Sequence, residues 1–140
     1  MDRDLIAAKL EQLRYCLNRL REKCPEDPDR LQKDPDLQDI IAMNLARAVQ
    51  ISVDIALHLL SERGEVPSTK GEAFERLAES GLLDDSLAER MRHAVGFRNI
   101  AVHAYDKIDW HLVTRICKER LVDFEEFGRA VYRLAFEQSS

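Results

Sequence analysis

The amino-acid sequence predicts an all-α fold, an antiparallel up-and-down bundle of four long helices and one short helix. Apolar residues recur at spacings of three and four along most of the 140-residue chain, which is the period of one face of an α-helix. Sustained polar–apolar alternation, the pattern of a half-buried strand, is missing from the sequence. The four prolines lie outside the interiors of the periodic segments, and short connections between them favour antiparallel neighbours.

The first long helix is predicted from the N-terminal apolar stripe. This stripe runs from Ile6 to Leu20 with spacings of four and three residues. The pair Cys24 and Pro25 ends it, because proline lacks the amide hydrogen that a helix interior needs. Acidic residues and further prolines over 25–35 indicate a loop.

A second long helix is predicted to start at Asp34 and Pro35. Asp34 is a suitable N-cap, and proline is favoured in the first helical turn. The apolar pattern continues through Leu59 to Gly64, and Pro67 follows the glycine as a further stop signal.

Three more helices complete the predicted bundle. Residues 69–72 have the form of a capping box and open the short helix, which runs to Gly81. Residues 86–89 repeat that form and open the fourth helix. The fifth begins near Asp109 and keeps its helical apolar period to Leu134.

Composition indicates one globular domain over residues 1–140. Apolar residues make up 45% and charged residues 34% of the chain, which excludes a disordered or collagen-like protein. No apolar stretch is expected to reach the roughly 20 residues of a membrane span, and the charged N-terminus is not typical of a signal peptide. The chain has three cysteines, Cys16, Cys24 and Cys117, and no C-x-x-C pair. This odd number of unpaired cysteines predicts reduced thiols and a cytoplasmic location.

Charge is unevenly distributed along the chain. The net charge is −5, which disfavours a non-specific nucleic-acid binder. Residues 90–120, however, carry +4, which leaves −9 on the remainder. This basic segment fits either a polyanion-binding site or an ordinary solvated helix face.

Several standard sites are absent from the sequence. It contains no glycine-rich phosphate loop, no G-x-S-x-G and no H-E-x-x-H motif. The four histidines show no i, i+4 pairing and the cysteines lie far apart in the chain, so we expect no metal site and no bound cofactor.

Residues 97–105 combine groups that fit RNA chemistry. Arg98 offers a planar fork of donors for phosphate oxygens. Histidine side chains can give or take a proton at neutral pH, so His103 could activate a ribose 2′-hydroxyl or protonate the leaving oxygen. These groups suffice for RNA cleavage without a metal, although an arginine cap and a core histidine would show the same spacing.

Helix geometry constrains how these residues meet. Asn99 and His103 are four residues apart, so on a continuous helix the amide lies beside the imidazole and can orient it. Arg98 and His103 are five apart, about 140° around the helix. Either two chains pool these residues across a two-fold axis, or the helix unwinds before His103.

The motif resembles that of the HEPN superfamily, and specifically of the HepT-like toxins. Their signature, R-x4-H-x-Y, is matched without a gap by Arg98, His103 and Tyr105, with Ala104 where Gly or Asp is common. The resemblance extends over about residues 35–135 and includes three further blocks in the same order: Asn44–Gln50 with Asp54 and His58, Gly64 to Leu77, and Asp106 to Asp109.

This resemblance implies a homodimeric, metal-independent endoribonuclease of a type VII toxin–antitoxin system. In that case Arg98 and His103 are catalytic, with Asn99 in support, in a cleft between protomers. The implied partner is a minimal nucleotidyltransferase antitoxin that transfers AMP from ATP onto Tyr105. The added phosphate and its bulk would then occupy the place of the RNA phosphate.

Two other readings of the motif remain open from the sequence. The chain could be a non-catalytic, nucleotide-binding partner of a nucleotidyltransferase, or a dimeric scaffold in which the motif is structural. Arg47 and Asp54 on the second predicted helix either flank the cleft or form solvated and intrahelical pairs.

Overall fold

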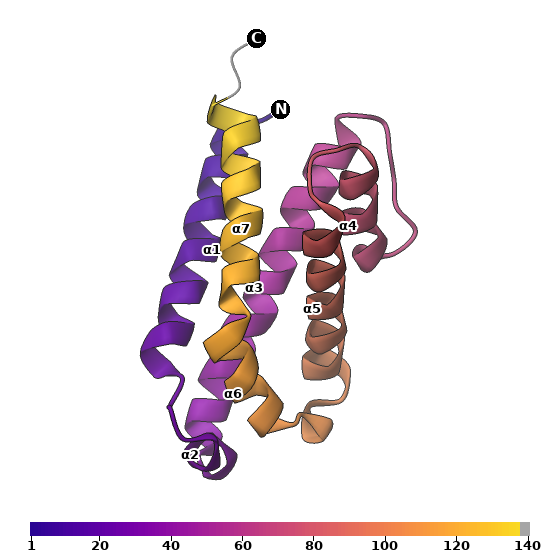
Figure 1. Cartoon of the computed structure of the whole chain (residues 1–140). Helices are drawn as coiled ribbons and strands as arrows, with labels where there is room; N and C mark the ends of the chain where they lie inside the picture. Colours follow the sequence, from indigo (N-terminus) through magenta and orange to yellow (C-terminus); the bar gives the residue numbers. More distant parts are fainter. Residues whose placement is uncertain (138–140) are drawn as a thin grey trace.

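The computed structural model describes residues 1–137, which fold almost entirely into helices (Figure 1). No strand occurs in this part of the chain, so the predicted all-α bundle is confirmed. A 3₁₀ turn at Tyr105–Lys107 follows α5, and a π-helical turn at Arg133–Glu137 follows α7. The helices in chain order are α1 (Arg3–Lys23), α2 (Pro28–Lys33), α3 (Pro35–Ser61), α4 (Lys70–Glu79), α5 (Asp85–His103), α6 (Trp110–Glu119) and α7 (Leu121–Tyr132).

The long helix α3 is the centre of the bundle. α1 packs along it, and α4 and α5 pack against it and against each other (Figure 1). α7 lies beside α1, while α6 packs against α2 at the opposite end of the bundle from the chain termini. The start of α1 is tied to the last described turn because Arg3 Nε donates to the carbonyl oxygen of Ala135 at 2.8 Å.

The structure differs from the predicted elements in three places. The stretch expected to be a loop contains α2, whose N-cap is Asp27 and whose Leu31 is fully buried. The fifth predicted helix is interrupted at Arg120, which ends α6 and precedes α7. α5 starts earlier than expected, because Asp84 accepts a hydrogen bond from the amide of Leu87 at 2.7 Å and so caps the helix.

One continuous apolar core joins the helices. Phe74 of α4 meets Phe127 of α7 edge to face, with ring centroids 5.6 Å apart. The buried hydroxyl of Ser52 donates to the carbonyl four residues earlier. The buried carboxylate of Asp123 accepts from Arg90 at 2.5 Å. Within residues 1–137, every buried side-chain polar atom has a hydrogen-bond partner.

The helix α3 corrects the expectation that no segment is apolar enough to span a membrane. Within its 27 residues an 18-residue window has a mean hydropathy of 1.5, sufficient by length and composition for a span. In the fold, 61% of this window is buried. The apolar character of α3 follows from its central place, where neighbouring helices cover it on several sides.

Candidate functional site

The R-x4-H-x-Y residues lie where α5 ends and the chain turns toward α6. α5 remains helical through His103, and Ala104 caps it with an irregular backbone conformation. Tyr105 then starts the 3₁₀ turn, and Asp109 caps α6 through the amides of His111 and Leu112. The alternative that the helix unwinds before His103 is therefore wrong for this structure.

A groove of about 530 Å³ runs between α3 and α5 and contains two of the three motif residues. Arg98 and Tyr105 line it from one side, and Arg47 lines it from α3. We call it the Tyr105 groove; its lining residues are Asp39, Ala42, Met43, Ala46, Arg47, Gln50, Arg98, Ala101, Val102 and Tyr105.

Two guanidinium groups give the Tyr105 groove its capacity for an anion. Within residues 1–137, neither Arg47 nor Arg98 forms an ion pair with a carboxylate. An arginine that is not already paired keeps its donors for phosphate oxygens. Both guanidinium groups are therefore available to an anion in the groove.

Tyr105 is held in this groove by two contacts. Its hydroxyl donates to Oδ1 of Asp39 at 2.5 Å, and its ring meets Trp110 edge to face at 5.7 Å between centroids. Burial raises the pKa of the Tyr105 phenol well above its ordinary value, and the hydrogen bond and negative charge of Asp39 raise it further. The phenol therefore stays protonated at neutral pH.

Asp39 was missed in the sequence analysis. It lies on α3 four residues before Met43 and eight before Arg47, so these three share one face of the helix. The i, i+4, i+8 spacing of Asp39, Met43 and Arg47 could have pointed to Asp39 from the sequence, once Arg47 was considered. The contact with Tyr105, 66 residues further along the chain, was not visible.

His103 and Asn99 are exposed and do not line the Tyr105 groove. Asn99 lines a second groove, also of about 530 Å³, together with Lys70 and Arg92. No hydrogen bond joins Asn99 to His103 among the described residues, although both lie on the helix face that geometry predicts. One chain therefore does not bring Arg98 and His103 to the same point.

Asp54 does not reach the Tyr105 groove. Its carboxylate accepts from Gln50 at 2.8 Å, one turn earlier on α3, and from Lys9 of α1 at 3.3 Å. The intrahelical pairing considered for Asp54 is thus present. Gln50 does line the groove, and its side-chain oxygen accepts from Lys70 at 3.2 Å.

The other titratable residues that the structure describes form no cluster suited to a metal ion. No group of three potential metal ligands occurs among residues 1–137. His58 lies near the N-terminus, where it accepts from the amide of Asp2 at 3.3 Å and lies 3.6 Å from Glu62. It takes no part in the Tyr105 groove.

Two cysteines that lie far apart in the sequence meet in the fold. Cys24 and Cys117 line one pocket beside Lys118, and the Cys24 thiol donates to the carbonyl oxygen of Pro25 at 3.7 Å. The neighbouring Cys117 thiol lowers the pKa of Cys24, whereas the neighbouring Cys24 thiol, together with burial, raises the pKa of Cys117. Burial also raises the pKa of Cys16. All three cysteines are free thiols in this structure.

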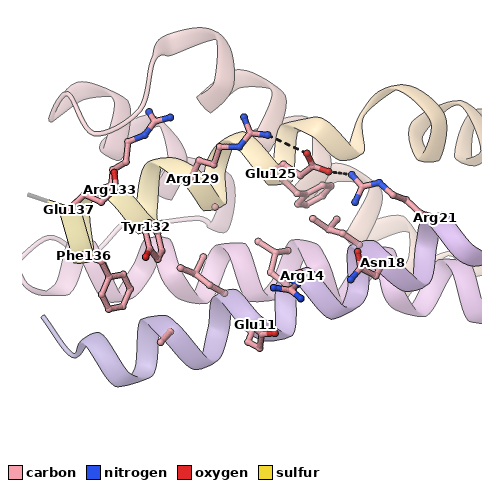
Figure 2. A pocket seen from close by; sticks show the side chains of 16 residues that line it. Glu11, Arg14, Asn18, Arg21, Glu125, Arg129, Tyr132, Arg133, Phe136 and Glu137 are labelled. Atoms are coloured by element: carbon pink, nitrogen blue, oxygen red, sulfur yellow. Dashed lines mark hydrogen bonds and ion pairs between the residues drawn. The ribbon is translucent and has the colours of Figure 1, made fainter.

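A wider cleft of about 840 Å³ lies between α1 and α7 and contains none of the predicted site residues (Figure 2). Three of its charged side chains pair with one another, because Glu125 forms ion pairs with both Arg21 and Arg129. Size alone therefore does not identify the reactive site in this protein.

Known proteins resemble this chain over most of its length. The family model described as "Ribonuclease HepT-like" matches residues 13–131. The Shewanella oneidensis protein named mRNA nuclease HepT is 30% identical over 125 residues, covering 89% of this chain and 93% of its own.

Solved structures show the same fold. A tri-AMPylated S. oneidensis HEPN toxin in complex with MNT antitoxin superposes with a TM-score of 0.86 at 30% identity, covering 94% of this chain and 98% of that one. The Bacillus subtilis cytosolic protein YutE, at 12% identity, shares the fold with a TM-score of 0.82 and covers 100% of this chain and 96% of its own. Because the family match spans most of the chain and the S. oneidensis relative aligns nearly end to end, this chain belongs to the HepT-like ribonuclease family.

Proposed function

We propose that this chain is the ribonuclease toxin of a toxin–antitoxin pair, a single-domain cytoplasmic enzyme that cleaves RNA as a homodimer without a metal ion. The observation that carries the proposal is the Tyr105 groove, where Arg98, Arg47 and Tyr105 lie together on an accessible surface. The name of the S. oneidensis relative, an mRNA nuclease, makes messenger RNA the first substrate to test.

In the proposed mechanism, Arg98 binds oxygens of the scissile phosphate and stabilises the charge that develops there. His103 acts as the acid or base, and Asn99, one turn earlier on α5, supports its orientation. Because the two catalytic side chains diverge within one chain, Arg98 of one protomer works with His103 of the partner subunit.

The homodimer is supported by apolar side chains around the groove. Met43 on α3 is 57% exposed and Val102 on α5 is 53% exposed in the single chain. A second copy docked over this face would remove both side chains from water.

Tyr105 is the proposed site of inactivation by AMP transfer from ATP. The partner that catalyses the transfer is a minimal nucleotidyltransferase antitoxin, in line with the AMPylated S. oneidensis complex. An AMP group on Tyr105 would place a phosphate beside Arg98 in the same groove. RNA and the modification would then compete for one anion site.

The test is RNA cleavage by protein produced without any nucleotidyltransferase and verified as unmodified by intact mass. Wild type is expected to cut messenger RNA, whereas Arg98→Ala loses at least about 100-fold in rate, as for the loss of a group that stabilises charge in the transition state. Arg115→Ala, which removes an exposed arginine of α6, is the matched control and keeps the wild-type rate. No cleavage by unmodified wild type would refute the proposal and favour a nucleotide-binding partner without catalysis.

A further inference from the structure

The hydrogen bond between Tyr105 and Asp39 spans the groove in which the proposed modification takes place. The hydroxyl of Tyr105 is the donor, and Oδ1 of Asp39 accepts at 2.5 Å. A bond of this length from a hydroxyl to a carboxylate is charge-assisted and stronger than one between neutral groups. Asp39 is thus the group in contact with the phenolic proton.

The ring of Tyr105 is fixed as well as its hydroxyl. Trp110 is 7% exposed and contacts the Tyr105 ring edge to face. Asp109 holds Trp110 in place because it caps the helix that Trp110 starts. Tyr105 itself is 39% exposed, so a reagent from solvent can approach a phenol that is already oriented.

We propose that Asp39 accepts the phenolic proton when Tyr105 receives AMP, an inference that rests on the proposed function. The Tyr105 oxygen forms a bond to the α-phosphorus of ATP, and the bond between that phosphorus and the α,β-bridging oxygen breaks. Pyrophosphate leaves with the bonding electron pair. The phenolic proton moves to Oδ1 of Asp39, which is exposed and returns it to solvent.

The contact with Asp39 also influences where the AMP group lies after transfer. Once the Tyr105 oxygen is esterified it carries no hydrogen, so its bond to Asp39 cannot form again. The new phosphodiester is negatively charged and is repelled by the Asp39 carboxylate, while Arg47 and Arg98 in the same groove attract it. The AMP group is therefore displaced from Asp39 toward the arginine that the proposed ribonuclease uses.

A purely structural role for Asp39 makes different predictions. If Asp39 only holds Tyr105 in place, Asp39→Asn preserves its function, because an amide of the same shape still offers an oxygen to the hydroxyl. If Asp39 takes the proton, Asp39→Asn fails and Asp39→Glu restores part of the rate, since only a carboxylate is a sufficient base.

The experiment measures initial rates of AMP transfer with radiolabelled ATP, Mg²⁺ and the S. oneidensis MNT antitoxin, using the S. oneidensis HEPN toxin as a positive control. Asp39→Asn is expected to lower the rate about 100-fold, within the range for loss of a general base, and Asp39→Glu to recover at least a tenth of it. Asp106→Asn, an exposed neighbour of Tyr105, is the matched control and keeps the wild-type rate. Tyr105→Phe identifies the labelled residue by losing all label.

The outcomes separate this inference from the proposed function. Wild-type labelling with an unchanged rate in Asp39→Asn overturns the role of Asp39 alone. Absence of label on wild type, while the control toxin is labelled, overturns the modification of Tyr105 and this inference with it. RNA cleavage by each unmodified variant is measured in parallel, because it judges the ribonuclease independently and shows that each variant is folded.

Discussion

Mixing two inactive variants tests whether the reactive site is shared between protomers. α5 is helical through His103, so its axial rise separates the backbones of Arg98 and His103 by about 7.5 Å and their side chains diverge by about 140°. Only Arg98 lines the Tyr105 groove. Arg98→Ala and His103→Ala homodimers should therefore both be inactive, each lacking one half of every site.

The mixture should regain a defined fraction of the wild-type rate. With random exchange half of the dimers are mixed, and each mixed dimer has one intact site out of two, which gives about one quarter of the wild-type rate. The assay is cleavage of a fluorogenic RNA after the two unmodified variants are refolded together, with native mass spectrometry to count mixed dimers. Background cleavage in a sample that contains mixed dimers would refute the shared site.

Four further predictions concern stability and reactivity. Phe74→Ala should cost about 3–5 kcal/mol in urea denaturation because it empties a fully buried aromatic site; a cost under 1 kcal/mol would contradict the packing described. Arg90→Ala should cost about 3 kcal/mol in the same assay because it leaves Asp123 buried without its partner, and an unchanged midpoint would argue against that ion pair. Folding raises the pKa of Tyr105, so the protonated phenol stabilises the fold fully below the ordinary tyrosine pKa of about 10, and this stabilisation is lost as the pH rises above it. Wild type should therefore lose stability relative to Tyr105→Phe above that pH, and parallel stability profiles of the two proteins would disprove the prediction. Iodoacetamide should label Cys24 first, since its pKa is lowered and it is only partly buried; peptide mass spectrometry showing equal labelling of all three thiols would contradict this order.

The long helices were predictable because each depends on a repeating local pattern. Asp34 caps α3 and Asp109 caps α6, both as their positions in the sequence indicated. α2 was not predictable, since six residues seldom form a helix without tertiary support, which here comes from burial of Leu31. The interruption at Arg120 likewise lies within an apolar period that continues across it.

The candidate site was predictable in its motif residues Arg98 and Tyr105 and in Arg47, but not in Asp39. Arg98 and Tyr105 were identified by their spacing and by resemblance, and the structure brings them together in one groove. The contribution of Asp39 could not be predicted, because its hydrogen bond with Tyr105, 66 positions away, depends on the packing of α3 beside α5. The pairing of Cys24 with Cys117 depends in the same way on contacts that no local pattern encodes.

The most direct test of the central claim is RNA cleavage in excess EDTA by unmodified wild type, His103→Ala and His93→Ala. His93 is an exposed histidine on the same helix, outside the Tyr105 groove, and serves as the matched control. We predict that wild type and His93→Ala cut RNA at equal rates, whereas His103→Ala is folded, dimeric and inactive. Cleavage by His103→Ala at the wild-type rate would contradict the assignment of acid–base chemistry to His103.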